Sequence, residues 1–111
     1  MTGDYTQLDP AFLGELHEME HDLGFPVSVN SGKRTPEHNA DPKVGGVLDS
    51  AHIEDPCRAA DIAVSGGWQR YEVVRWALEH HIKRIGVGKT FVHLDRSPTL
   101  PQSVLWEYTH G

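Results

Sequence analysis

The segment FVHLD at residues 91–95 constrains the fold of this chain more than any other stretch. Alternate side chains of a β-strand share a face, so His93 and Asp95 project to one side while Val92 and Leu94 project to the other. Burying an imidazole next to a carboxylate is costly unless both groups find partners. The segment therefore predicts a strand with one apolar face, whose polar face is either simply exposed or part of a binding site.

Other stretches of the sequence are also typical of strands. The segment CRAADIAVS at 57–65 places apolar residues on one face and Asp61 on the other, and FPVSVNSGKRT at 25–35 alternates valines with polar residues. Residues 84–95 read as two short strands or a hairpin with a Gly-Lys-Thr turn. The segment LPQSVLWEY at 100–108 predicts a last strand with Pro101 at its start.

Two helices are predicted from apolar residues at three- and four-residue spacing. The first follows Asp9 as N-cap with Pro10 in its first turn, and it ends at Gly24. Its apolar stripe contains Phe12, Leu16, Met19 and Leu23. The second helix extends from a Ser65 cap to Arg84. Its expected stripe is Tyr71, Val74, Leu78 and Ile82, with Val73 and Ala77 beside it.

The order helix, strand, loop, strand, helix, strand, strand predicts a single α+β domain over residues 1–111. We expect a mostly antiparallel sheet with both helices on one face. The long connection at 36–56 is rich in Gly, Pro, Asp and Asn and shows no periodicity. Connections of that length in compact domains are usually functional or disordered.

Charge and composition exclude several classes of protein. The net charge of -6 argues against a nucleic-acid partner, which needs a basic face. No stretch approaches the roughly 20 apolar residues of a membrane span. The start MTGDYTQLDP lacks the basic residues and the apolar run of a signal peptide, so we expect synthesis in a bacterial cytoplasm without one. We also expect the protein to be a monomer. Cys57 is the only cysteine, which rules out an internal disulfide and a Cys-rich zinc site.

His52, Asp61 and His93 together match the ligand set of a catalytic zinc site, two imidazoles and one carboxylate with a position left open. Such a set leaves the ion a strong Lewis acid that acidifies water and polarises a carbonyl. The spacing of His52 and Asp61 alone is not specific. A rival interpretation makes Cys57 a nucleophile with His52 as base, but a buried structural thiol fits its surroundings better.

Four short motifs together resemble a known family. They are Ser31-Gly32-Lys33-Arg34, Ser50-Ala51-His52, Ala59-Ala60-Asp61-Ile62 and Phe91-Val92-His93-Leu94-Asp95. The chain is similar, over about residues 25–108, to the zinc D-alanyl-D-alanine carboxypeptidases and their relatives among phage endolysins and bacterial cell-wall endopeptidases. These proteins share a fold with the hedgehog signalling domain.

The resemblance implies zinc held by His52, Asp61 and His93, and an Arg34 that polarises the scissile carbonyl or binds a substrate carboxylate. It also implies a late tryptophan in the site, for which Trp106 is the candidate. We further expect Ser31 and Ser50 to hydrogen-bond near the site. His38 either lines the site or stabilises its own turn.

The chain departs from the family pattern in two ways. Eight residues separate His52 from Asp61, where the family usually has a shorter turn. The position three residues before His93, which often carries the general base, is Thr90. Asp95 is the nearest substitute, either as base or as an acceptor that orients a ligand imidazole. Two acids next to His52 are weaker alternatives, Glu54 and Asp55.

The expected function is hydrolysis of a peptide bond in the stem peptide or cross-link of peptidoglycan, as a carboxypeptidase or an endolysin-type endopeptidase. The resemblance implies a phage-encoded enzyme that acts on the host wall after release or as part of a virion. The alternative is a non-catalytic zinc-binding module that binds a peptide or partner, or a structural phage component. Asp95 and Arg34 are the expected catalytic residues of the first function.

Overall fold

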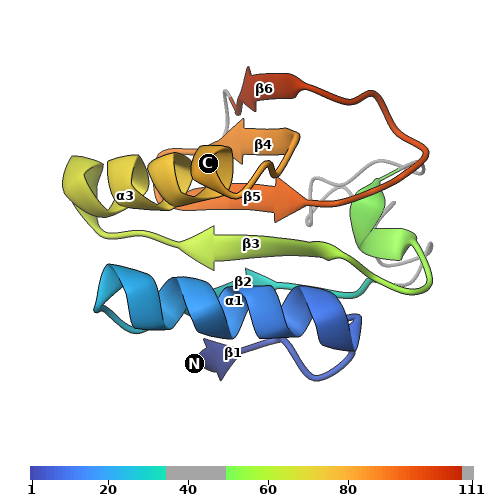
Figure 1. Ribbon diagram of the computed structural model, residues 1–111, viewed down its shortest axis with the longest axis horizontal. Helices are drawn as coiled ribbons and strands as arrows, with labels where there is room; N and C mark the ends of the chain where they lie inside the picture. Colours follow the sequence, from blue (N-terminus) through green and yellow to red (C-terminus); the bar gives the residue numbers. More distant parts are fainter. Residues whose placement is uncertain (35–49, 109–111) are drawn as a thin grey trace.

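The computed structural model describes residues 1–34 and 50–108 (Figure 1). Their secondary-structure elements are β1 (Thr2–Gly3), α1 (Pro10–Leu23), β2 (Ser28–Ser31), the 3-10 turn η1 (Ala51–Ile53), β3 (Ala59–Ala63), α3 (Gly66–Glu79), β4 (Arg84–Val87), β5 (Phe91–Asp95) and β6 (Val104–Glu107).

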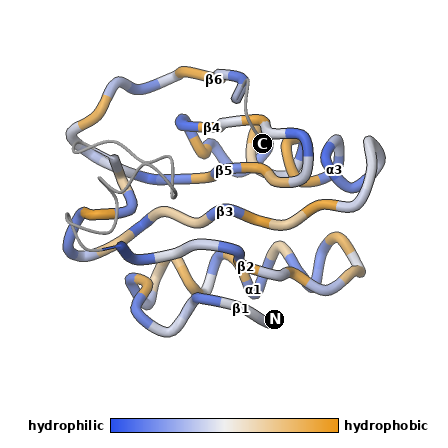
Figure 2. The backbone as a smooth tube through the Cα atoms, turned by 180° about the vertical axis from the view of Figure 1, so that it is seen from behind, coloured by the Kyte–Doolittle hydropathy of each residue, from blue (hydrophilic) through white to orange (hydrophobic). Residues whose placement is uncertain are grey.

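The strands form one sheet in the order β1-β2-β3-β5-β4-β6. Its centre is antiparallel, through the pairs β2–β3, β3–β5 and β4–β5, and the short edge pairs β1–β2 and β4–β6 are parallel. Helices α1 and α3 lie on one face, in front of the sheet in Figure 1 and behind it in Figure 2. The predicted α+β architecture is thus confirmed.

Helix α1 begins and ends as the sequence predicts. Asp9 accepts a hydrogen bond from the Phe12 amide at 3.1 Å, Pro10 opens the helix, and Gly24 closes it in the left-handed conformation at φ 76°. Three of the four residues in the expected stripe are buried, namely Phe12, Leu16 and Met19. They pack with the apolar face of the sheet in the hydrophobic core.

Helix α3 differs from its prediction in length and in orientation. It ends at Glu79 rather than near Arg84, because His81 takes up a left-handed conformation at φ 60° and turns the chain toward β4. Tyr71 and Leu78 of the expected stripe are 64% and 57% exposed. The buried residues of the helix are Val73, Trp76 and Ala77.

Trp76 explains the rotation of helix α3. Its indole is 1% exposed, and its Nε1 donates to Asp22 of α1 at 2.9 Å, so a large aromatic group is buried with its one polar atom satisfied. Burying Trp76 turns the Tyr71 and Leu78 side of the helix outward. Ser65 precedes the helix without a side-chain capping bond, and its amide instead donates to Gln69.

The C-terminal strands confirm the predicted hairpin, in which β4 and β5 flank residues 88–90. Strand β6 begins at Val104, later than the predicted start at Pro101, and it pairs with β4. Strand β1 was not predicted. It pairs with β2 through only two residues, too few for a pattern to reveal.

The two faces of the sheet differ in chemistry. Figure 2 shows hydrophobic and hydrophilic residues alternating along β3 and β5. The apolar positions, such as Ile62 and Leu94, face the helices and are fully buried. The opposite face carries Asp61, His93 and Asp95, which are therefore brought together on the side away from the helices.

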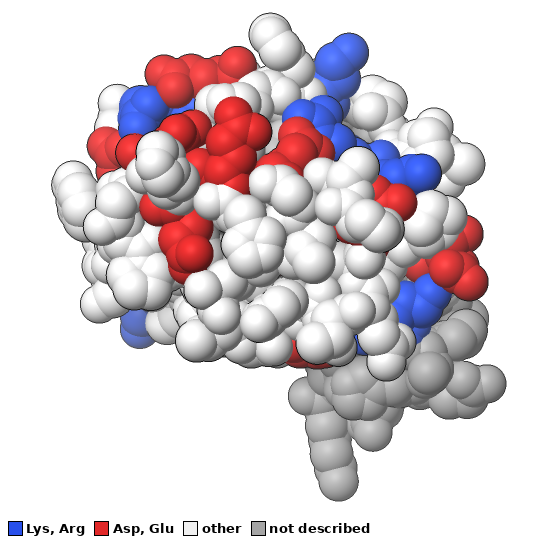
Figure 3. Space-filling model, turned by 60° about the horizontal axis from the view of Figure 1, so that its bottom comes forward, with Lys and Arg blue, Asp and Glu red and all other residues white. Residues whose placement is uncertain are grey.

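The outer surface carries charges of both signs. In Figure 3 acidic side chains gather mainly toward one side of the visible face, with basic side chains in separate groups. None of the helices in the described part of the chain is long and apolar enough to cross a membrane.

Candidate metal centre

Pairing of strands brings together the three predicted metal ligands. In the β3–β5 ladder Asp61 lies directly opposite His93, and η1 delivers His52 to the same place. Asp61 Oδ1 is 3.2 Å from His52 Nε2 and 2.9 Å from His93 Nδ1. One ligand atom from each residue lies within 4.8 Å of the other two. Both histidines are 3% exposed, so the cluster (His52, Asp61 and His93, hereafter the trio) is largely shielded from water.

The outer nitrogen of each imidazole has its own acceptor. His52 Nδ1 donates to the Gly32 carbonyl at 2.7 Å, and His93 Nε2 donates to Asp95 Oδ2 at 2.5 Å. A neutral imidazole that keeps its proton on the outer nitrogen can offer the lone pair of its inner nitrogen to a metal ion. This arrangement is the one that metal-ligating histidines show, in which the second ring nitrogen binds a carbonyl or carboxylate.

The charges of the trio stabilise one another. Burial would raise the pKa of Asp61, but hydrogen bonds and attraction from His52 and His93 outweigh burial and hold that pKa well below its usual range. Burial would likewise lower the pKa of His93, but its bonds to Asp61 and Asp95 raise it.

Arg34 lies closer to the ligands than the sequence indicates. Its Nη2 donates to Asp61 Oδ2 at 3.2 Å, and its Nε donates to Ser31 Oγ at 2.8 Å. The carboxylate of Asp61 therefore has one oxygen toward the histidines and the other toward a guanidinium. Ser31 holds the arginine in place, while Ser50 caps η1 by accepting from the His52 amide at 3.1 Å. Both serines thus bond next to the site, as predicted.

Gly32 has a steric reason to be glycine. A Cβ atom there would lie 2.3 Å from the Asp4 carbonyl oxygen, and backbone cannot move aside as a side chain can. The close approach also aims the Gly32 carbonyl at His52. The glycine of the Ser31-Gly32 motif therefore lies where its carbonyl can hold the candidate ligand His52.

Gly32→Ala is expected to lower the free energy of unfolding by about 2–3 kcal/mol, because the added methyl group overpacks against backbone. The control is Gly14→Ala in α1, where a Cβ meets nothing within 4 Å and alanine is expected to stabilise by about 0.5–1 kcal/mol. Denaturant unfolding of both variants measures this. Equal effects at the two positions would contradict the steric argument.

Aromatic side chains border the trio on the β6 side. The Trp106 ring centroid is 5.4 Å from that of His93. The Tyr108 ring packs against Phe91 at 4.9 Å and against Trp106 at 6.2 Å, both measured between ring centroids. Burial and the negative charge of Asp61 raise the pKa of Tyr108, so its phenol stays protonated. Gly86 makes room for both rings, since a Cβ there would lie 2.6 Å from each.

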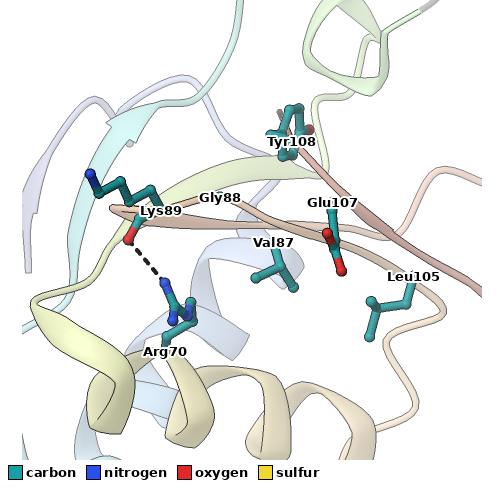
Figure 4. Close-up of a pocket in the computed structure, with 7 residues that line it drawn as sticks. All are labelled: Arg70, Val87, Gly88, Lys89, Leu105, Glu107 and Tyr108. Carbon is teal, nitrogen blue, oxygen red and sulfur yellow. Dashed lines mark hydrogen bonds between the residues drawn. The ribbon is translucent and has the colours of Figure 1, made fainter. Parts of the chain in front are cut away.

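Tyr108 was missed at the level of sequence, although the two-residue period from Trp106 would have found it. Figure 4 shows its ring on the opposite side of the strands from Val87, Leu105 and Glu107. All four residues help to line an open hollow, together with Arg70, Gly88 and Lys89.

The acids considered as general base are all engaged elsewhere. Asp95 is fully buried and its Oδ2 bonds the outer nitrogen of His93, which is the contact that an orienting acceptor makes. Glu54 Oε2 accepts from the hydroxyls of Ser97 at 2.7 Å and Thr99 at 3.1 Å. The Asp55 side chain is 91% exposed, next to Lys33.

The rival interpretation of Cys57 and the expectation for His38 have different outcomes. Cys57 is 1% exposed and burial raises the pKa of its thiol, so the structural interpretation is confirmed over the nucleophilic one. His38 lies outside the described residues.

Buried histidines that flank a carboxylate, on the face of a sheet away from its helices, are the ligand set used by metal-dependent hydrolases. The family model for peptidase M15 matches residues 2–95, and this chain belongs to that family. Membership implies a peptidase of a metal-dependent family, typically one that uses zinc. No curated protein and no solved structure matches the chain. The matched range contains the trio and Arg34, while Trp106 and Tyr108 follow it.

Proposed function

We propose that this chain is a zinc peptidase that hydrolyses a peptide bond in the stem peptide or cross-link of peptidoglycan. The observation that carries the proposal is the orientation of the two imidazoles. Because Gly32 and Asp95 occupy the outer nitrogens, His52 Nε2 and His93 Nδ1 both face Asp61 Oδ1. Two imidazoles and one carboxylate match catalytic zinc sites in the type and number of their ligands. The hydrogen bonds of the outer ring nitrogens also match those of histidines that bind zinc.

Zinc would be held by His52, Asp61 and His93 and would supply the Lewis acidity that activates water and polarises the scissile carbonyl. Arg34 would bind the substrate next to this centre. Its guanidinium is held by Ser31 and Asp61 at the border of the trio, where it presents positive charge. Stem peptides carry free carboxylates, which a guanidinium recognises through charge-assisted hydrogen bonds.

The aromatic border would contribute to binding of the peptide. Trp106 presents its ring next to His93, Tyr108 packs on Trp106, and a protonated Tyr108 hydroxyl is available as a hydrogen-bond donor. Rings in this place exclude water from one side of the trio, which strengthens electrostatic interactions inside the site.

The competing function is a zinc module that binds a peptide without cleaving it. The observation in its favour is that Asp95, Glu54 and Asp55 each lie or bond away from the inner side of the trio. Thr90, at the position where relatives often carry the base, has no basic side chain. The two functions differ in whether chelator-sensitive products form.

The test is mass spectrometry of purified peptidoglycan fragments incubated with the protein, with and without a chelator. New fragments that vanish with chelator and return with added zinc are expected, and their masses identify the bond. Intact fragments at high protein concentration, with zinc confirmed bound, would favour the binding module. The phage setting of the enzyme stays a prediction.

Zinc affinity is expected to fall as the pH is lowered through neutrality. The histidines must lose their inner protons to bind a metal. Since the pKa of His93 is raised, protons compete with zinc at a higher pH than for an ordinary histidine. The expected slope is about tenfold per pH unit for each proton displaced. Competition with a chromogenic chelator from about pH 6 to about pH 8 measures it, and a flat profile would contradict the assignment of His93.

A further inference from the structure

Arg84 lies behind the metal centre, and nothing in the sequence pattern drew attention to it. On β4 it is paired directly opposite Asp95 of β5. Its Nε donates to Asp95 Oδ1 at 2.8 Å, while Asp95 Oδ2 accepts from His93 Nε2. The exposed fractions of the two side chains are 12% for Arg84 and 0% for Asp95. Hydrogen bonds thus connect Arg84 to Asp95 and Asp95 to the candidate ligand His93.

The direction of the Asp95 carboxylate is fixed by two donors on the same oxygen. Arg84 Nε and the Ser97 amide, at 3.0 Å, both bond Oδ1. This leaves Oδ2 aimed at His93. A buried carboxylate is costly without a compensating charge, and Arg84 supplies that charge. Each carboxylate of the centre therefore has its own arginine, Arg34 for Asp61 and Arg84 for Asp95.

Arg84 also fastens the segment that leads into β6. Its Nη1 donates to the Pro101 carbonyl at 2.7 Å, and its guanidinium lies 5.1 Å from the centre of the Trp106 ring. Trp106 in turn borders His93. One side chain thus bonds the group that orients a ligand and packs on the aromatic border of the site.

We propose that Arg84 is a positioning residue that sets the metal affinity of the trio. It holds Asp95 against the outer nitrogen of His93, so that His93 presents Nδ1 to the metal. This inference rests on the proposed function only in taking the trio as a zinc site. It requires no particular substrate.

The test compares Arg84→Met and Arg84→Lys with the wild-type protein. Zinc dissociation constants come from competition with a chromogenic chelator, and the tautomer of His93 in the metal-free protein comes from long-range proton–nitrogen NMR. Arg84→Met is expected to weaken zinc binding about 10–100-fold and to reduce the share of His93 protonated on Nε2. Arg84→Lys is expected to fall between, because an ammonium restores charge but not the fork that spans Asp95 and Pro101.

The matched control is Arg96→Met. Arg96 makes an equally close pair with Glu15, with two N–O distances of 2.7 Å, and Glu15 belongs to α1 on the far side of the sheet. This variant is expected to lose stability while keeping the zinc affinity and the His93 tautomer of the wild type. If Arg84→Met does not fold, Arg84→Gln takes its place with the same expected direction.

Unchanged zinc affinity and tautomer in a folded Arg84 variant would overturn the inference. Equal weakening by Arg96→Met would also overturn it, since the effect would then be one of general stability. A wild-type protein that binds no zinc would overturn it together with the proposed function. A protein that binds zinc in an Arg84-dependent way but leaves peptidoglycan intact would uphold the inference and refute the proposed substrate alone.

Discussion

Asp61→Asn is expected to reduce peptide hydrolysis at least about a thousandfold and to abolish stoichiometric zinc binding at micromolar concentrations. Asp61 is the only anionic member of the trio, and both imidazoles face its Oδ1. A neutral amide is a poor ligand for zinc, and its NH2 group would repel the ion. The loss of Lewis acidity alone is worth several kcal/mol of barrier, which corresponds to about three powers of ten.

The measurements for Asp61→Asn are zinc content by elemental analysis and the rate of fragment release from peptidoglycan. The control is Asp22→Asn, which changes a carboxylate that binds Trp76 between the two helices. It is expected to leave zinc content and rate unchanged. An Asp61→Asn protein that retains zinc and activity would remove Asp61 from the ligand set.

Asp95→Asn is expected to weaken zinc binding about 10–100-fold and to lower hydrolysis in parallel. Arg84 and Ser97 both donate to Asp95 Oδ1, so an asparagine would turn its carbonyl oxygen toward them. Its NH2 group would then face His93 Nε2 and favour the tautomer protonated on Nδ1. That proton would occupy the nitrogen meant for the metal.

Zinc affinity and hydrolysis rate, measured on the same Asp95→Asn preparation, separate the two roles that the sequence left open for this residue. A rate that falls while zinc affinity stays at the wild-type value would identify Asp95 as the general base. Glu15→Gln is the control, because it alters an equally well bonded carboxylate, which binds Arg96 away from the trio. Parallel loss in that variant would indicate a general effect on folding.

Local signals explain why parts of the fold were predictable. Asp9, Pro10 and Gly24 fix the bounds of α1 through capping and backbone conformation, which depend only on neighbouring residues. The rotation of α3 was predicted wrongly because the period of 3.6 residues permits more than one stripe. Burial of Trp76 decided between them through its bond to Asp22, a contact 54 residues away in the sequence.

The candidate site was likewise predictable where local patterns decide and unpredictable where distant contacts do. Strand alternation put Asp61 and His93 on polar faces, and motif resemblance grouped them with His52. Alternation predicts which face a side chain takes, but not which nitrogen of an imidazole it meets, so the sequence could not predict the bond between Asp95 and the outer nitrogen of His93. The role of Arg84 depends on the pairing of β4 with β5, which sets it opposite Asp95 and which no local pattern encodes.

The edge position of β6 affects how readily water reaches the metal centre. Among the described residues, Trp106 borders His93 from a four-residue strand, Tyr108 follows that strand directly, and the strand hydrogen-bonds to the sheet through β4 alone. Edge strands with few buried contacts open more readily than central ones. The amides of β6 should therefore exchange with deuterium ahead of those of β3 and β5. Brief peeling of this strand, rather than motion of the ligands themselves, would then be the event that hydrates the metal centre and lets substrate and product pass.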